Sequence, residues 1–221
     1  MLDQPVMETA AGVSAVLPPE RPACRPRGAA LRLAAADNCS HERAELEAFV
    51  GDAFARKHDA TVTSFMPTLL SFRDHAGTLR GAVGLRSAGD EALYLENYLD
   101  RPIESAIESA TGHRVHRRNV VEVGNLASAN CRAAVKMVTL LPAHLLARDF
   151  RWIVFTATSV VREILLGFGA PLVELAHAES ARVARGSDRW GRYYETDPRV
   201  FAGFLPDSRK VRGFKTVEHG H

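Results

Sequence analysis

Apolar residues recur at the period of a helix, or alternate as in a strand, along most of the chain after residue 30. The clearest helical pattern follows Ser40, which suits an N-cap, and Glu42, which suits a first helical turn. Its apolar members lie at i, i+3, i+4, i+7 and i+8 and are Leu46, Phe49, Val50, Ala53 and Phe54. This stripe predicts an amphipathic helix that packs on a sheet.

Runs with strand character lie on both sides of that helix. A short strand is expected to begin at 31–33. Two further runs, at 65–72 and 79–85, are separated by a polar, glycine-bearing loop that suits a hairpin. Another short strand is expected at 93–95. The first half of the chain therefore predicts a hairpin, further short strands and one covering helix.

The second half alternates helices with strands. Pro102 suits the first turn of a helix that ends near Gly112, and the β-branched run at 119–127 predicts a central strand. Gly124 weakens this strand and predicts a bulge within it.

A long helix is expected over 130–148, with a kink or break at Pro142 because proline has no backbone N–H. The elements after it are a strand at 153–157, a helix that Thr158 or Ser159 caps and Gly169 ends, a strand at 172–176 and a Trp- and Tyr-rich tail. This order, without internal repeats, predicts a mixed α/β fold.

The length of 221 residues suits one domain. Five prolines lie in the first thirty residues and favour a flexible arm: Pro5, Pro18, Pro19, Pro22 and Pro26. We therefore expect an arm at 1–29, one domain at 30–206 and a tail at 207–221.

Composition and charge narrow the classes of function. With 46% hydrophobic and 24% charged residues the chain should form a real core, and a net charge of +2 with scattered basic residues does not favour nucleic acid as the main ligand. No apolar stretch is long enough for a membrane span, and the N-terminus lacks a secretory signal. The three cysteines have no metal-binding spacing, so we expect free thiols, no metal site and a cytoplasmic location.

Glu122 is a carboxylate on a strand predicted to be buried, which requires an explanation because an unpaired buried charge is costly. In one interpretation Glu122 is a general base or anchors a substrate amine, and Asn125 orients a carbonyl or a water. In the other, Glu122 pairs with a nearby arginine such as Arg86, and Asn125 only ends the bulge. The sequence leaves both open.

Other reactive residue types have simpler alternatives. Cys131, near a helix start, could be a nucleophile or an incidental cysteine. His113 and His116 lack a third ligand. The aromatic tail, Trp190, Tyr193 and Tyr194, could line an acyl pocket or supply an acid, or could simply pack the last strand. The motifs of common hydrolases, P-loop NTPases and zincins are missing from the sequence.

Five blocks in one order resemble the bacterial thermostable hemolysin family and span about 31–205. They are 65–70 (FMPTLL), 95–104 (LENYLDRPIE), 121–127 (VEVGNLA), 155–158 (FTAT) and 190–195 (WGRYYE). That family is similar in turn to GNAT acyltransferases and to acyl-homoserine lactone synthases. The resemblance implies a GNAT-like, twisted mixed sheet flanked by helices, with a splayed strand pair that forms a wedge for an acyl thioester.

The resemblance also implies roles for individual residues. Glu122, Asn125 and Tyr194 are the expected catalytic residues, and Arg86, Glu96 and Tyr98 the expected contacts of the acceptor. The expected contacts of the donor thioester are Val123, Gly124, Leu126, Arg132 and Thr156.

One departure from the GNAT pattern concerns the donor. The turn at 128–133 (SANCRA) has no glycine, whereas members that use CoA carry a glycine-rich turn there. This favours a donor on an acyl carrier protein over acyl-CoA. Four basic residues could contact the phosphate of that donor, namely Arg114, Arg117, Arg118 and Arg132. Alternatively, these arginines form only a solvated surface.

The resulting hypothesis is an N-acyltransferase that moves a fatty acyl group from a carrier protein or CoA to the amine of an amino acid or a related small molecule, without a permanently bound cofactor. The alternatives are a directly membrane-active, lipid-binding protein and a GNAT-shaped binding module that has lost its chemistry.

Overall fold

The computed structural model describes residues 32–35, 41–167, 171–183 and 190–205. The expected arm at 1–29 and tail at 207–221 lie outside these ranges. So do Ser40, the expected N-cap of the first helix, and Gly169, the expected end of the fourth.

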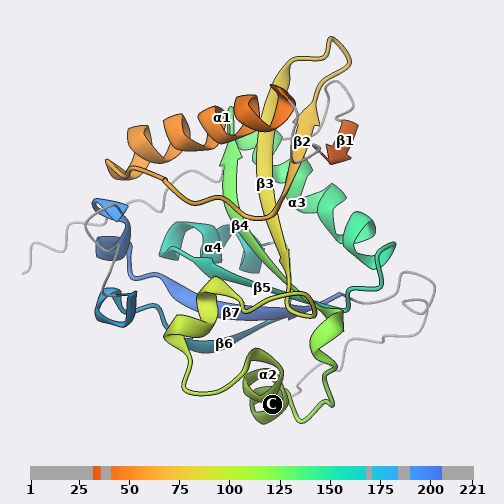
Figure 1. Cartoon of the computed structure of the whole chain (residues 1–221), viewed down its shortest axis with the longest axis vertical. Helices are drawn as coiled ribbons and strands as arrows, with labels where there is room; N and C mark the ends of the chain where they lie inside the picture. The colour runs from red at the N-terminus through yellow and green to blue at the C-terminus, as the bar shows by residue number, and fades with distance from the viewer. Residues whose placement is uncertain (1–31, 36–40, 168–170, 184–189, 206–221) are drawn as a thin grey trace, which may run out of the picture.

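One seven-stranded sheet organises the described residues (Figure 1). Its order is β1 (Arg32–Ala35), β2 (Thr68–Arg73), β3 (Leu79–Ser87), β4 (Val120–Ser128), β5 (Trp152–Ala157), β7 (Arg199–Phe204) and β6 (Leu172–His177). The β4–β5 pair is parallel and the other pairs are antiparallel. This architecture confirms the predicted mixed α/β fold.

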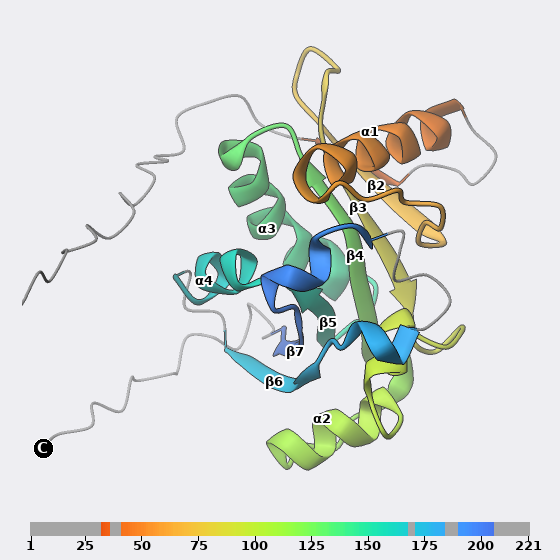
Figure 2. The same cartoon turned by 90° about the vertical axis from the view of Figure 1, so that its left-hand side faces the viewer.

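Helices cover both faces of the sheet (Figure 2). Residues of β4 alternate between the two cores: Val121 and Val123 join the cluster that contains Met137 and Leu141, whereas Val120 joins the cluster that contains Ile107. The face of Val120 is covered by α1 (His41–His58) and α2 (Ile103–Thr111), and the opposite face by α3 (Cys131–Leu146) and α4 (Ser159–Gly167).

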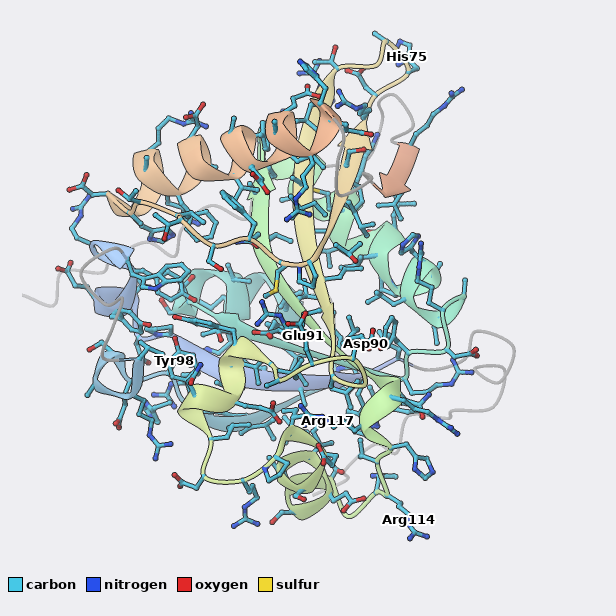
Figure 3. All side chains as sticks on the ribbon, in the orientation of Figure 1. His75, Asp90, Glu91, Tyr98, Arg114 and Arg117 are labelled. Carbon is cyan, nitrogen blue, oxygen red and sulfur yellow. The ribbon has the colours of Figure 1, made fainter. Side chains whose placement is uncertain are left out.

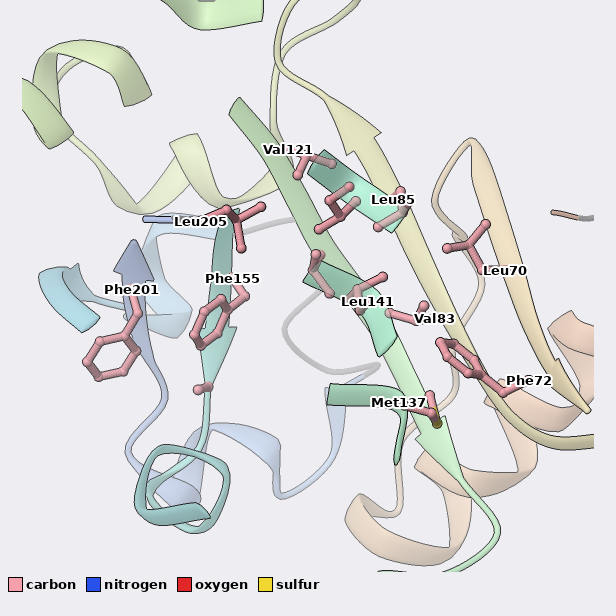
Figure 4. Packing of buried hydrophobic residues seen from close by; sticks show 13 residues of the cluster. Leu70, Phe72, Val83, Leu85, Val121, Met137, Leu141, Phe155, Phe201 and Leu205 are labelled. Carbon is pink, nitrogen blue, oxygen red and sulfur yellow. The ribbon is translucent and has the colours of Figure 1, made fainter. Parts of the chain in front are cut away.

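The larger core lies beneath α3. Figure 4 shows Met137 and Leu141 of this helix over the strands, close to Val83, while Phe155 and Phe201 stack with ring centroids 6.0 Å apart. Burial of such side chains stabilises the fold by about 2 kcal/mol each. The strands that carry the polar residues described below are therefore firmly held.

Two predictions about elements were wrong. The segment expected as a strand at 93–95 forms the 3₁₀ helix η1 (Tyr94–Tyr98). The strand β7 was missed, because 199–204 was assigned to the aromatic tail, yet it pairs with β5 on one side and β6 on the other.

Helix α3 continues through its proline. Asn130 caps the helix by accepting a hydrogen bond from the Ala133 N–H at 2.9 Å, and the helix runs to Leu146 with Pro142 inside it. Because Pro142 has no N–H, the carbonyl of Val138, four residues earlier, has no α-helical donor.

Candidate active site

The parallel strands β4 and β5 separate halfway along their length. Their ladder pairs Val120 with Trp152 and ends where Val123 pairs with Phe155, although β4 continues to Ser128. Strand β5 stays paired with β7 as far as Ala157. A gap therefore opens between β4 and β5 beyond Val123, bordered by backbone groups that the ladder no longer uses.

A bulge in β4 accompanies the gap. Gly84 of β3 pairs with Gly124, but Ala82 pairs with Ala127, so β4 carries one extra residue. The bulge was expected at Gly124; the left-handed backbone, with φ of 47°, occurs instead at Asn125. Asparagine tolerates this conformation better than most residues.

Gly124 has a different role. A Cβ at Gly124 would lie 2.5 Å from the Cε of Met66, so the glycine lets Met66 pack against the strand. The Oδ1 of Asn125 accepts a hydrogen bond from the Met66 N–H at 2.8 Å. The side chain of Asn125 thus fixes the segment before β2, a role that neither interpretation of this residue included.

A cavity of about 1130 Å³ spans the gap and reaches both faces of the sheet. We call its part beside α1 and η1 the polar limb; among its lining residues are Phe54, Arg86, Tyr94, Tyr98, Glu122, Trp190 and Tyr193. We call its part between α3 and α4 the apolar limb; among its lining residues are Val138, Leu141, Pro142, Leu146, Val161 and Leu165. The expected residues Val123, Gly124, Leu126 and Thr156 line the cavity between the two limbs.

Glu122 lies in the polar limb with only 3% of its surface exposed. Its two carboxylate oxygens accept hydrogen bonds from the backbone N–H groups of Tyr94, at 2.8 Å, and Leu95, at 3.1 Å. Burial raises the pKa of Glu122 to about 7, although these two hydrogen bonds and the charge of Arg86 oppose the rise. Near neutral pH the group can therefore both take up and release a proton.

Arg86 is the cross-strand neighbour of Glu122, but the two do not form the ion pair that the structural interpretation expected. The Nε of Arg86 instead forms an ion pair with the Oε1 of Glu91 at 3.6 Å, which is too long for a hydrogen bond. This Nε is buried without a hydrogen-bond partner. Such a group requires an explanation, and in a cavity wall a ligand oxygen is the simplest one.

The two tyrosines expected at the site are hydrogen-bonded to each other. The hydroxyls of Tyr98 and Tyr194 are 2.8 Å apart, but only Tyr98 lines the cavity. Burial raises the pKa of both, to about 12 for Tyr194. At neutral pH both phenols are therefore protonated, and Tyr194 reaches the cavity only through Tyr98.

Aromatic side chains form one wall of the polar limb. The ring centroid of Trp190 lies 6.2 Å from that of Phe54, 6.2 Å from that of Tyr94 and 5.5 Å from that of Tyr193. The segment is fixed to the end of α1, because the Arg192 N–H donates to the His58 carbonyl at 2.8 Å. Trp190 and Tyr193 therefore pack on α1 and line the cavity, whereas Tyr194 does not line it.

Glu96, expected at the acceptor, does not line the cavity. Its carboxylate accepts hydrogen bonds from the N–H groups of Leu93 and Ile103, at 2.9 Å each, and from Arg117 at 2.6 Å. Hydrogen bonds from Arg117 and these N–H groups lower the pKa of Glu96 to about 2. Glu96 therefore fixes η1, the element whose N–H groups hold Glu122.

The basic residues expected to contact a phosphate do not form one surface. Arg132 lies in the first turn of α3, after the end of β4, whereas Arg114 and Arg117 precede its start, about 30 Å away along a nine-residue strand. Arg117 forms ion pairs with Glu96 and Glu104, and Arg114 projects outward beyond α2 (Figure 3). Cys131, an exposed free thiol, lines the cavity mouth at the start of α3.

Several lining residues had no signal in the sequence analysis. Tyr94 was assigned to a strand, and its role depends on its backbone N–H. Thr158 was one of two candidate caps of α4, with Ser159, but its Oγ1 is buried without a hydrogen-bond partner, while its carbonyl accepts from the Arg162 N–H. Among the described residues, no group of three or more His, Cys, Asp or Glu is arranged to hold a metal ion.

A family model described as thermostable hemolysin matches residues 36–209, which is most of the chain. A search of curated proteins gives no match.

Solved structures share the fold at low sequence identity. The chain is similar to a CoA-dependent acyl-homoserine lactone synthase, BjaI, solved with SAM and isopentyl-CoA (10% identity; 81% of this chain and 84% of that chain; TM-score 0.56). It is also similar to the AHL synthase LasI (10% identity; 81% of this chain and 92% of that chain; TM-score 0.52). A further similar structure is FeeM, an N-acyl amino acid synthase from uncultured soil microbes (12% identity; 80% of this chain and 92% of that chain; TM-score 0.51). The fold is therefore the GNAT-like fold of acyl-transferring enzymes, as the sequence predicted.

No helix in the described parts of the chain is long and apolar enough to cross a membrane.

Proposed function

The chain belongs to the thermostable hemolysin family, and we propose that it is an N-acyltransferase that moves a fatty acyl group from a thioester to the amine of an amino acid or a related small molecule. The observation that carries this proposal is the position of Glu122, a buried carboxylate with a pKa of about 7, in a cavity that crosses the gap between β4 and β5.

The gap suits the arm of an acyl thioester. Pantetheine contains amide groups, which can hydrogen-bond to the backbone of β4 and β5 beyond Val123 as a strand would. The start of α3 lines the same cavity, so the donor phosphate would lie near Asn130 and the acyl chain would extend into the apolar limb. Arg132, in the first turn of α3, is a candidate contact of that phosphate.

The polar limb suits the acceptor. Its amine would approach Glu122, and a carboxylate on the same molecule would pair with Arg86, whose Nε has no hydrogen-bond partner. The two side chains are cross-strand neighbours, a separation comparable to that of the amine and carboxylate of an amino acid. This charge complementarity favours an amino acid over an amine that carries no carboxylate.

The reaction then follows in two steps. Glu122 accepts a proton from the acceptor ammonium, directly or through a water, and the neutral amine attacks the thioester carbon. Backbone N–H groups in the gap stabilise the negative charge on the carbonyl oxygen. As the intermediate collapses to an amide and a thiolate, the nitrogen loses its second proton, which the hydrogen-bonded hydroxyls of Tyr98 and Tyr194 can relay to the sulfur, so that both phenols end protonated.

The donor is proposed to be an acyl carrier protein, because the turn before α3 lacks the glycines of a CoA-binding loop. Acyl-CoA is the alternative donor of the same class. Both are cytoplasmic thioesters, and we place the reaction in that compartment.

The test is mass spectrometry of lipid extracts from cells that express the wild-type chain, Glu122→Gln or the control Glu163→Gln, whose carboxylate is exposed on α4. An N-acylated product should appear with the wild type and the control and be lost with Glu122→Gln. Absence of any product, together with lysis of liposomes by the purified protein, would overturn the proposal in favour of direct membrane activity.

A second measurement addresses the acceptor. With a carboxylate-bearing amine, Arg86→Met should raise KM at least about 10-fold while kcat changes little. With the corresponding amide-capped amine, wild type and variant should behave alike. Equal KM values for the carboxylate-bearing acceptor would exclude the proposed ion pair.

A further inference from the structure

Two polar groups of residues that line the cavity lack the hydrogen bond that is usual for their position. The first is the carbonyl of Val138, which loses its α-helical donor to Pro142. The second is the Oγ1 of Thr158, which is buried and has no hydrogen-bond partner. Val138, Pro142 and Thr158 all line the cavity.

The carbonyl of Val138 belongs to the face of α3 that borders the limb. Residues spaced three or four apart along this helix line the cavity, including Ala134, Val138, Pro142 and Leu146. A helical carbonyl points toward the residue four positions later, so that of Val138 lies between two lining side chains. Neighbouring Thr139 cannot satisfy it, since its hydroxyl donates to the Val135 carbonyl at 2.9 Å.

Thr158 gives independent support. It directly precedes α4, a position where a threonine oxygen usually accepts a hydrogen bond from the first helical turn. Its Oγ1 makes no such bond, although 95% of the residue's surface is buried. A buried hydroxyl without a hydrogen-bond partner is costly unless a ligand completes it.

We propose that the apolar limb selects a fatty acyl chain that carries a hydroxyl group. This inference rests on the proposed function, because it assumes that the cavity binds an acyl thioester. It concerns only the acyl chain of that thioester. A hydroxyl donates one hydrogen bond and accepts others. It can therefore donate to the Val138 carbonyl, accept from Thr158, or do both, whereas an unsubstituted chain can hydrogen-bond to neither group. The surrounding Val161, Leu165 and Leu141 bind the rest of the chain.

The test uses equilibrium binding, which does not depend on turnover. Dodecanoic acid is compared by calorimetry with hydroxydodecanoic acids that carry the hydroxyl at successive carbons from 3 to 6. The wild-type protein should bind at least one hydroxy acid about 10-fold more tightly than dodecanoic acid, as expected for one hydrogen bond completed in an apolar site.

Two variants identify the groups responsible. Pro142→Ala restores a helical N–H to the Val138 carbonyl, improves helix propensity and should reduce the preference to about 2-fold or less. Thr158→Val removes the second group at nearly constant volume and should also weaken the preference. The control is Pro171→Ala, which lines the same cavity outside any helix and should keep the wild-type preference.

Equal binding of hydroxylated and plain acids by the wild type, or a preference that survives both variants, would overturn the inference. A clear preference without any acyl transfer would instead leave the inference intact and count against the proposed function. The two failures are therefore distinguishable.

Discussion

The carboxylate of Glu122 accepts a hydrogen bond from the backbone N–H of Tyr94 at 2.8 Å, which ties β4 to the first residue of η1. A second N–H, that of Leu95, donates to the other oxygen. An ionised carboxylate offers about four acceptor positions, so two remain for an acceptor amine or a water. The backbone contacts orient Glu122 without removing its capacity to take a proton.

The pH dependence of the rate should report Glu122. Since only the ionised carboxylate can act as a base, kcat/KM should rise about 10-fold per pH unit below an apparent pKa near 7 and level off above it. Steady-state kinetics from pH 5 to 9 measure this. The residual activity of Glu122→Gln should show no inflection near 7, and an unchanged inflection would assign it to another group.

Stability should fall as the pH rises through the same range. The pKa of Glu122 is raised in the folded protein from 4.5 to about 7, so between these values the folded state binds more protons than the unfolded state. The contribution of this group is complete below pH 4.5 and is lost by about pH 7, a change of roughly 3 kcal/mol.

Urea unfolding at pH 5 and pH 8 tests this dependence. The free energy of unfolding of Glu122→Gln should change less between the two pH values than that of the wild type. Parallel pH dependences would mean that Glu122 ionises normally in the fold.

The close contact between Gly84 and Met66 should make that glycine irreplaceable. A Cβ at Gly84 would lie 2.6 Å from both the Cβ and the Cγ of Met66, atoms that cannot swing away. Gly84→Ala should therefore destabilise the protein by about 1–3 kcal/mol. Gly51→Ala is the matched control: nothing lies within 4 Å of its added Cβ, and in α1 it should stabilise by about 0.5–1 kcal/mol. Chemical denaturation of both variants gives the comparison, which fails if Gly84→Ala is neutral.

Removal of Arg117 should destabilise η1 and α2 together. Its guanidinium donates to Glu96, Glu104 and the carbonyl of Ala88, so Arg117→Ala should cost about 3 kcal/mol. Arg114→Ala, on the exposed link nearby, should change stability by less than about 0.5 kcal/mol. Equal midpoints of thermal unfolding for the two variants would contradict this assignment.

The same network predicts a loss of stability in acid. The pKa of Glu96 is lowered from 4.5 to about 2, so its stabilising contribution is present above pH 4.5 and disappears as the pH falls toward 2. The Arg117→Ala variant should lose less stability over this interval than the wild type.

The parts of the fold that depend on local pattern were predictable. The stripe from Leu46 to Phe54 gave α1, and the β-branched run that begins at Val120 gave β4. Strand β7 was missed because what defines it is pairing with β5 and β6, which no local pattern records. Its one local signal, the apolar run of Val200 to Ala202, is too short to separate from a tail.

The candidate site divides in the same way. Glu122 stood out because a carboxylate on an apolar strand is unusual, whereas Arg86 was only one of several arginines that could pair with it, and the structure makes it the cross-strand neighbour. Glu96 was assigned to the acceptor because the resemblance covers its block, whereas its position three residues after Leu93 and seven before Ile103 suits backbone N–H groups at both ends of a loop. The burial of Thr158 without a partner is a three-dimensional fact that the sequence does not carry.

The position of β7 in the sheet has a consequence for biosynthesis. Strands β5 and β6 are synthesised first, but each has an unpaired edge until residues 199–204 leave the ribosome and insert between them. Pairings of this kind are made late and fold slowly, since a long loop must close before they form. Until then, Phe155 lacks its stacking partner Phe201, and the incomplete sheet exposes apolar side chains and unpaired strand edges to chaperones and proteases.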